Sequence, residues 1–186
     1  MTIRTFDWEP RFDERSRAHR LTVDASELRT KNRRLLPRLD QGSEGACVGF
    51  GVSHSLACPP KSQEVSDEWA QALYEEAKRI DEWAGEDYDG TSVLAGMTAA
   101  QKAGRIASYR WAFGLQDVLL ALSWAGPVVI GVWWLEGMME APDGIEPMIV
   151  AGARVGGHCV CLHGLHLEDR LVRFRNSWGE DWGRRG

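Results

Sequence analysis

A cysteine preceded by a glycine-bearing turn is the first residue of this chain that could do chemistry. Cys47 opens the apolar stretch Cys-Val-Gly-Phe-Gly-Val after the turn Gln41–Gly45. If that stretch is a helix, its N-terminus stabilises a thiolate and lowers the thiol pKa. Gln41 could aim its amide at the same point. Far downstream, His158 follows two glycines and Asn176 opens Asn-Ser-Trp-Gly. The chain thus offers a cysteine, a histidine and an asparagine in that order.

The elements expected to position these residues change in character along the chain. Apolar spacing and end signals predict helices over residues 46–57, 66–83, 92–102 and 115–125. Ser66 is the expected N-cap of the second helix, Thr91 or Ser92 caps the third, and Gly104 closes it. Runs rich in apolar and β-branched residues predict strands over residues 128–134, 157–167 and 171–175. Helices followed by strands indicate an α+β fold with a seam near residue 110, and the cleft between two such lobes is a natural active site.

The size and composition indicate one globular domain. The chain has 186 residues, of which 44% are hydrophobic and 26% are charged, so it can bury a core. The net charge of −5 argues against a dedicated nucleic-acid binder. The charge is uneven, because residues 1–38 carry +4 and residues 39–186 carry −9. We expect a basic N-terminal extension that folds back on the acidic body, with docking on an acidic partner as the alternative.

Neither a membrane span nor a secretory signal is expected. Residues 1–20 are studded with charges and lack an apolar core segment. The uncharged stretch 118–135 has Gly126-Pro127 at its centre, which favours a core helix, a turn and a strand. We therefore expect a cytoplasmic protein with free thiols. The cysteines are Cys47, Cys58, Cys159 and Cys161.

Three segments together resemble the papain-like cysteine peptidases. The Gln-Gly-x-x-Gly-x-Cys segment of that family is met at Gln41–Cys47 with its six-residue spacing. Its Gly/Asp-His-Ala-Val strand is met at Gly157–Val160, and its Asn-Ser-Trp-Gly-x-x-Trp-Gly signature is complete at Asn176–Gly183. The resemblance covers roughly residues 40–186.

The resemblance implies a two-lobed α+β fold with the active site in the cleft between the lobes. The catalytic domain would span residues 39–186, with a helical lobe over about 39–110 and an antiparallel β lobe over about 111–186. Residues 1–38 would form the N-terminal extension. The expected substrate is a polypeptide, and no cofactor is expected.

The resemblance also implies roles for the motif residues. Cys47 would be the nucleophile and His158 its partner in a thiolate–imidazolium pair, with the Asn176 side-chain oxygen orienting the imidazole. Gln41 and the backbone N–H of Cys47 would form the oxyanion hole. Trp178 would shield the hydrogen bond between Asn176 and His158 from water.

Three more residues are expected at the substrate. Trp182 would line the leaving-group side of the cleft, and Gly90 and Gly157 would bind the substrate. Gly90 would do so through its backbone, from a loop that faces the nucleophile.

The chain departs from the family pattern at several points. Glu44 stands where secreted members carry a disulfide cysteine, and Val48 stands where an aromatic residue usually follows the nucleophile. Both departures fit a reduced, bacterial or bacteriophage member. The 46 residues before Cys47 are too few for the long inhibitory prosegment of the secreted enzymes, and the chain ends at Gly186, where the family continues into another strand.

Other interpretations of the same residues stay open. Cysteine and histidine ligate zinc, but residues two apart on a strand seldom converge on one ion, so we expect no metal at the cluster His158, Cys159, Cys161, His163 and His166. The proposed triad could also serve an amidase, an isopeptidase or a peptidoglycan-cleaving hydrolase. A non-catalytic binding module that keeps the fold is the remaining alternative.

Overall fold

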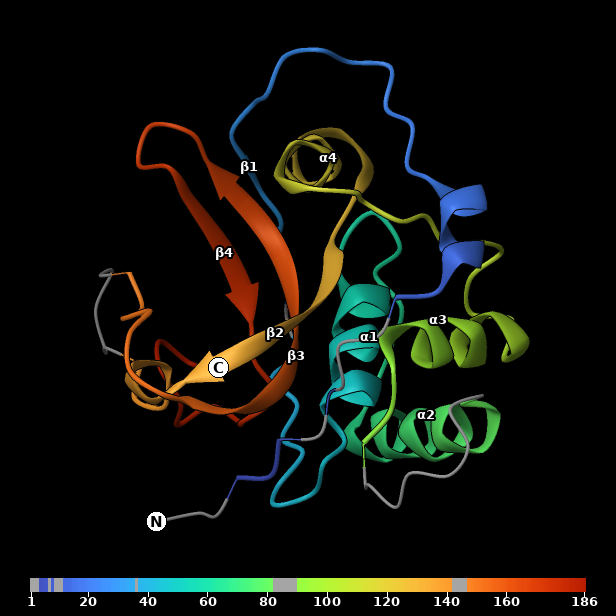
Figure 1. Ribbon diagram of the computed structural model, residues 1–186, viewed down its shortest axis with the longest axis vertical. Coiled ribbons are helices and arrows are strands. Elements are labelled where there is room, and N and C mark those ends of the chain that lie inside the picture. Colours follow the sequence, from blue (N-terminus) through green and yellow to red (C-terminus); the bar gives the residue numbers. More distant parts are fainter. Residues whose placement is uncertain (1–3, 7, 9–11, 36, 82–89, 142–146) are drawn as a thin grey trace.

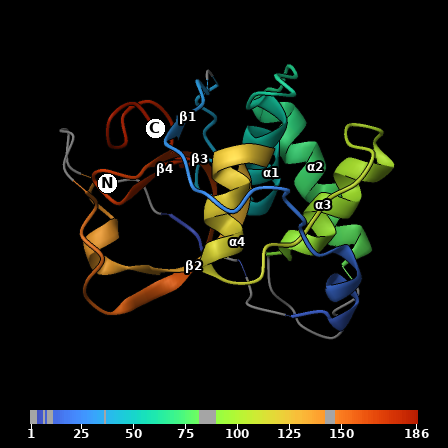
Figure 2. The same cartoon turned by 90° about the horizontal axis from the view of Figure 1, so that it is seen from above.

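A helical group and an antiparallel sheet pack side by side in this protein (Figure 1). The computed structural model describes residues 4–6, 8, 12–35, 37–81, 90–141 and 147–186. Helices α1 to α3 lie on one side and the strands on the other, and the view from above shows the same separation with α4 between them (Figure 2). The α+β class expected from the order of the elements is confirmed.

Helix α1, Cys47–Ala57, is the central helix and is buried on almost every side. Small residues let its neighbours come close. A β-carbon on Gly49 would lie 2.4 Å from the carbonyl oxygen of Ala70, and one on Gly51 would lie 2.9 Å from the sulfur of Cys159. Helix α1 therefore packs against a second helix and the sheet at once, and its N-terminal cysteine is held between them.

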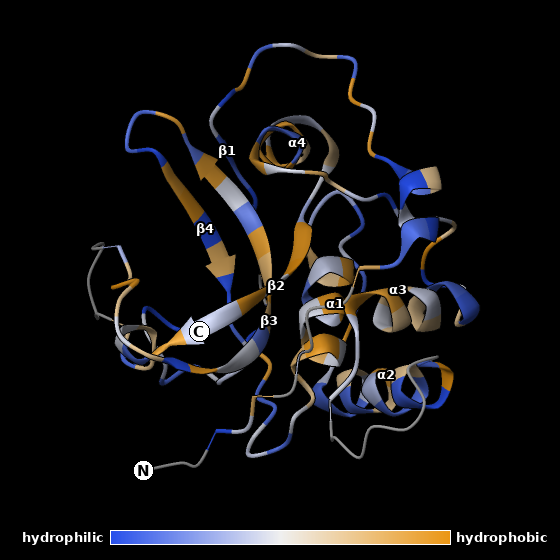
Figure 3. Ribbon diagram, in the orientation of Figure 1, coloured by the Kyte–Doolittle hydropathy of each residue, from blue (hydrophilic) through white to orange (hydrophobic). Residues whose placement is uncertain are grey.

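Helices α2, Asp67–Ile80, and α3, Val93–Lys102, begin at the predicted caps. The Ser66 hydroxyl accepts the N–H of Trp69 at 3.2 Å, and the Ser92 hydroxyl accepts the N–H of Ala95 at 3.1 Å. Each bond satisfies a backbone donor that the first turn leaves without a partner. Figure 3 shows hydrophilic residues on α2, whereas α1 is apolar to neutral, as expected for an outer and an inner helix.

The sheet is built around the long strand β3, Arg154–His166. It pairs antiparallel with β2, Val128–Leu135, with β4, Leu171–Arg175, and with the two-residue strand β1, Lys31–Asn32. The register places Val132 opposite His158 and Gly131 opposite Cys159. The three longer strands were predicted, but β1 was not, because two residues are too few to show an alternating pattern.

The uncharged stretch forms a helix, a turn and a strand, as its Gly-Pro centre predicted. Helix α4, Leu115–Leu120, continues into a π-helical turn, Ala121–Ala125, and the chain then enters β2. A short 3-10 helix, Glu136–Met138, follows β2. Within the described ranges, no helix has the length and apolarity needed to cross a membrane.

The described part of the basic extension packs on the acidic body. Ion pairs join Arg4 to Asp40 at 3.2 Å, Arg20 to Asp117 at 3.4 Å and Arg38 to Glu180 at 2.7 Å. The extension also contains a 3-10 helix, Glu14–His19, and strand β1. The buried guanidinium of Arg33 donates to the carbonyl of Leu122 at 2.6 Å. These ion pairs and this hydrogen bond hold the N-terminal extension against parts of the chain that are distant in sequence.

Candidate active site

The proposed nucleophile lies where the helical group meets the sheet. Cys47 is the first residue of α1, and the N-cap residue Ala46 has no side chain that could engage the N–H groups of the first turn. These N–H groups are the feature that stabilises a thiolate at a helix start. Cys47 packs in one apolar cluster with Cys159 of β3, the residue that follows His158. Cys47 and His158 are both 0% exposed.

The histidine and the asparagine of the motifs meet in a short hydrogen bond. Nε2 of His158 lies 2.7 Å from Oδ1 of Asn176, and both residues are buried. Because the amide oxygen can only accept, Nε2 carries the hydrogen. Oδ1 also accepts the backbone N–H of Ser177 at 2.8 Å, which fixes the amide. Nδ1 of His158 has no hydrogen-bond partner among the residues that the structure describes, so it is the nitrogen available to take a proton.

Aromatic rings enclose this hydrogen-bonded pair. The centroid of the His158 ring lies 5.1 Å from the centroid of the Trp178 ring and 4.8 Å from that of the Trp134 ring. Trp134 was not singled out from the sequence. Strand alternation could have indicated it, because Trp134 shares a sheet face with Val132, and Val132 is paired with His158. Water is thereby kept from the bond between His158 and Asn176.

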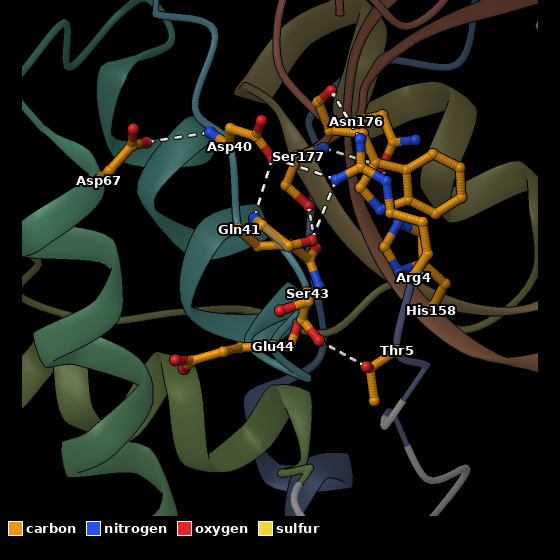
Figure 4. Close-up of polar contacts among 12 residues, drawn as sticks. Arg4, Thr5, Asp40, Gln41, Ser43, Glu44, Asp67, His158, Asn176 and Ser177 are labelled. Carbon is orange, nitrogen blue, oxygen red and sulfur yellow. Dashed lines mark hydrogen bonds and ion pairs between the residues drawn. The ribbon is translucent and has the colours of Figure 1, made fainter. Parts of the chain in front are cut away.

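Gln41 is held in place by two residues (Figure 4). Its Oε1 accepts the hydroxyl of Ser177 at 2.5 Å, and its backbone N–H donates to the Ser177 carbonyl at 2.9 Å. Its Nε2 donates to the carbonyl of Glu44 at 2.6 Å. A primary amide has two N–H donors, so one remains for another acceptor.

The start of the chain lies over the site. We call Arg4, Thr5, Phe6 and Trp8 the cover segment. The Arg4 guanidinium donates to the Asp40 carboxylate at 3.2 Å and to the carbonyls of Gly42 and Trp178 at 3.0 and 3.3 Å. The Thr5 hydroxyl donates to the Ser43 carbonyl at 2.5 Å, as Figure 4 shows.

The other two residues of the cover segment reach the histidine and its strand. The Phe6 ring stands edge-on to His158, with ring centroids 5.7 Å apart. The Trp8 N–H donates to the Gly157 carbonyl at 2.9 Å. The sequence does not mark this segment as part of the site, because the segment carries no motif and no periodic pattern.

The covered site favours a neutral imidazole. Burial lowers the pKa of His158 to about 4, the hydrogen bond to Asn176 opposes that shift, and the charge of Arg4 adds to it. The imidazolium implied by the family resemblance is therefore not favoured while the cover segment is in place. Removing the segment would admit water and take away a cation, and both changes raise the pKa of His158.

The remaining cysteines are suited to packing. Burial raises the pKa of Cys58 to about 11, and it raises the pKa values of Cys159 and Cys161 well above the ordinary range. A thiol with a raised pKa is a poor nucleophile. Across the described residues, no group of three or more His, Cys, Asp and Glu side chains is arranged to hold a metal ion.

Three buried histidines predict that acid destabilises the fold. Burial lowers the pKa of His54 to about 3 and those of His158 and His163 to about 4, whereas an unfolded histidine titrates near 6.5. Between these values the unfolded chain binds protons that the folded chain excludes. We expect the free energy of unfolding to fall as the pH drops from about 6.5 to 4, by up to about 1.4 kcal/mol per pH unit for each histidine.

Denaturant unfolding at a series of pH values measures the slope of the free energy of unfolding against pH. His54→Gln removes one of the three groups and should make the slope shallower, and His19→Gln at an exposed position is the matched control. A slope that His54→Gln leaves unchanged would contradict the assignment.

The structure describes the three residues that were predicted to bind the substrate, but not most of the loop that carries one of them. Gly157 lies in β3 beside His158, and its carbonyl is in use by Trp8. Trp182 packs on Trp178 and donates its indole N–H to the Met139 carbonyl at 3.1 Å. Gly90 is buried shortly before α3, and the loop that was expected to face the nucleophile, residues 86–90, lies mostly outside the described residues.

Known proteins similar to this chain include a viral protein and several solved cysteine protease structures. No protein-family profile matches the chain. A curated protein of Acanthamoeba polyphaga mimivirus, an uncharacterized peptidase C1-like protein, is 20% identical over 196 residues. That match covers 81% of this chain and 63% of the viral protein, so the chain spans less than two thirds of its relative's length.

Solved structures identify the fold. Xylellain, a cysteine protease from Xylella fastidiosa, matches with a TM-score of 0.71 at 18% identity, over 100% of this chain and 89% of xylellain. A procathepsin B from Trypanosoma congolense matches with a TM-score of 0.61 at 15% identity, over 98% of this chain and 79% of its own. Procathepsin L 3 of Tenebrio molitor matches with a TM-score of 0.62 at 16% identity, over 92% of this chain and 67% of its own. The chain has the papain-like cysteine protease fold, and the resemblance seen in the motifs is confirmed.

Proposed function

We propose that this chain is a thiol-dependent hydrolase that cleaves peptide or isopeptide bonds through an acyl-enzyme on Cys47. The observation that carries the proposal is the buried 2.7 Å hydrogen bond between Nε2 of His158 and Oδ1 of Asn176. It selects the tautomer in which Nδ1 is bare, and a bare imidazole nitrogen can take a thiol proton. Cys47 packs with Cys159, the residue next to His158 in the chain. The papain-like fold supports the same assignment.

In the proposed reaction the sulfur of Cys47 attacks the carbonyl carbon of the substrate as its proton moves to Nδ1 of His158. The carbonyl electron pair moves onto the oxygen, which the backbone N–H of Cys47 and the second amide N–H of Gln41 stabilise. The intermediate then expels the amine, which takes the proton from His158, and a thioester remains. Water then gives a proton to Nδ1 of His158 as its oxygen attacks the thioester carbon. The carbon–sulfur bond breaks as the proton passes from His158 to the sulfur, which releases the acid and restores the free thiol and the neutral imidazole.

Each supporting residue has a physical reason for its role. Asn176 keeps the imidazole oriented while His158 first accepts a proton and then donates it. The side-chain oxygen of Asn176 is itself fixed by the N–H of Ser177. Ser177 also holds Oε1 of Gln41, so one residue positions both the orienting group and the oxyanion donor. The Gly157 carbonyl already accepts a backbone N–H from Trp8 and could accept one from a substrate.

The first test of this function is a substrate panel. Peptide, isopeptide and cell-wall amide substrates are offered to the full chain and to Trp8→Ala, which weakens the cover segment. Cleavage of peptides or isopeptides that depends on Cys47 is the expected result. Turnover of cell-wall amides alone would favour the peptidoglycan-cleaving alternative, and no turnover of any substrate would favour a binding module.

Gln41→Ala is expected to reduce kcat by about 10² to 10³ with little change in KM, because one oxyanion donor is lost. The change is measured by steady-state kinetics in the Trp8→Ala background, with Gln101→Ala on the surface of α3 as control. An increase in KM at unchanged kcat would mean that Gln41 binds the substrate and not the transition state.

A further inference from the structure

We propose that Asp67, the first residue of helix α2, is a positioning residue that orients Gln41 for the proposed reaction. Residues 39–41, which we call the oxyanion strand, carry Gln41 at their end, and the Asp67 carboxylate binds the middle residue of this strand (Figure 4). This inference rests on the proposed hydrolase function and adds a residue to it. Asp67 acts through the backbone of Asp40 and not on the substrate itself.

One edge of the oxyanion strand is bound to the Asn-Ser-Trp-Gly motif. The N–H of Gly179 donates to the carbonyl of Leu39 at 3.3 Å, and the N–H of Gln41 donates to the carbonyl of Ser177 at 2.9 Å. Between these bonds, Asp40 forms an isolated antiparallel bridge with the tryptophan of the motif. In a pairing of this kind the N–H of the middle residue points away from the partner segment. The N–H of Asp40 therefore needs an acceptor on the other side of the strand.

Asp67 supplies this acceptor from the helical group. Its Oδ1 accepts the N–H of Asp40 at 3.0 Å. Figure 4 shows the Asp67 side chain reaching from its helix to the backbone of Asp40, on the side where Gln41 also lies. A carboxylate binds a backbone N–H more strongly than a neutral oxygen does. The middle of the oxyanion strand is thus held between the motif on one side and α2 on the other.

The residue before Asp40 is fixed to the same helical group. The Leu39 side chain is buried in an apolar cluster with residues of α1 and α2. Its N–H makes a long hydrogen bond of 3.5 Å to Nε2 of His54 in α1. Gln41 follows directly, so a displacement of Asp40 also displaces the proposed oxyanion donor. Such a donor works only when it is aimed at the point where negative charge develops.

A purely structural role of Asp67 can be separated from positioning, because α2 carries two acids in its first turn. Any acidic residue at a helix start stabilises the helix through its dipole. Glu68 is such a residue, and its carboxylate bonds to the N-cap Ser66. Of the two acids, Asp67 is the one bonded to Asp40. Glu68 is therefore the matched control for the loss of a negative charge at this helix end.

The experiment measures steady-state kinetics of the full chain in the Trp8→Ala background, in which the cover segment is weakened. Asp67→Ala is expected to lower kcat about tenfold with KM nearly unchanged, since a hydrogen bond to a charged group is worth a rate factor of about that size. Asp67→Asn keeps an oxygen acceptor and should recover most of the lost activity. Glu68→Ala should leave kcat unchanged. A loss in Asp67→Ala no greater than that in Glu68→Ala would overturn the inference.

A double-mutant cycle with Gln41 tests whether Asp67 acts through that residue. In the Gln41→Ala variant, adding Asp67→Ala should lower kcat by less than about twofold, because the two changes then remove one shared effect. An equally large loss with and without the Gln41 side chain would mean that Asp67 acts on another part of the site, and would overturn the inference. Asp67 is exposed at the start of its helix, so the variants should fold, and a thermal unfolding scan checks each of them.

Hydrogen exchange separates this inference from the proposed function. Exchange in the segment that contains the oxyanion strand is followed by mass spectrometry in the full chain, in Asp67→Ala and in Glu68→Ala. We expect faster exchange in Asp67→Ala alone, because the N–H of Asp40 loses its acceptor. Faster exchange with no hydrolysis by any form would keep Asp67 as the anchor of the oxyanion strand and overturn the hydrolase. Hydrolysis at an undiminished rate in Asp67→Ala would keep the hydrolase and overturn the positioning role.

Discussion

Cys47→Ala is expected to abolish turnover while the protein stays folded. The change removes the attacking sulfur, and loss of a catalytic nucleophile costs on the order of 10⁶ in kcat in enzymes with such a triad. It deletes one atom from a buried site, so the expected loss of stability is small beside the loss of activity. Steady-state kinetics in the Trp8→Ala background measures the first effect, and thermal unfolding measures the second.

Cys58→Ala is the matched control for this prediction. Cys58 is a buried cysteine like Cys47, and its raised pKa makes it a poor nucleophile. Turnover should therefore persist in Cys58→Ala. Unchanged turnover in Cys47→Ala would remove the basis for the proposed hydrolase, since no other described cysteine has the surroundings of a nucleophile.

Loosening the cover segment is expected to expose the nucleophile. Trp8→Ala removes an aromatic side chain that packs against Gly131 and Trp133. Arg4→Ala removes three hydrogen bonds and the stacking of the guanidinium, whose carbon lies 5.3 Å from the centroid of the Trp178 ring. Losing the contacts of a partly buried aromatic group corresponds to a factor of up to about 100 in the population of the open form. We expect alkylation of Cys47 by iodoacetamide to accelerate by that factor, with Cys58, Cys159 and Cys161 still unlabelled in the intact protein.

Peptide mapping by mass spectrometry reads the site and rate of alkylation. Arg17→Ala is the control, because Arg17 forms an exposed ion pair with Glu14 in the same extension, away from the site. In Arg4→Ala the pKa of His158 should also rise, because a cation that lowers it is gone. The acid limb of the pH profile of labelling should move with it. Equal labelling rates in wild type and in both variants would show that the cover segment does not restrict access.

Much of the fold could be predicted because its elements carry local signals. Helix α2 has an N-cap serine and an amphipathic pattern, and it begins and ends within a few residues of the prediction. Strand β4 has the predicted bounds, and the Gly-Pro pair separated α4 from β2. The three motifs identified the proposed triad and Gln41, because each residue lies in a segment whose local sequence is distinctive.

What the sequence by itself determined was therefore the class of the fold, the order of its elements and the residues that could do the chemistry. Only the tertiary structure decided how they meet. The hydrogen bond of His158 to Asn176, the ring of Trp134 and the lowered pKa of His158 depend on strand register and burial.

The cover segment is the clearest case. No cap, period or motif marks Arg4, Phe6 or Trp8, because their places are set by contacts with residues more than a hundred positions away, at Gly131, Gly157 and Trp178. Side-chain fit between distant segments leaves no periodic trace in either segment. It exists only once both lobes have folded around the cleft.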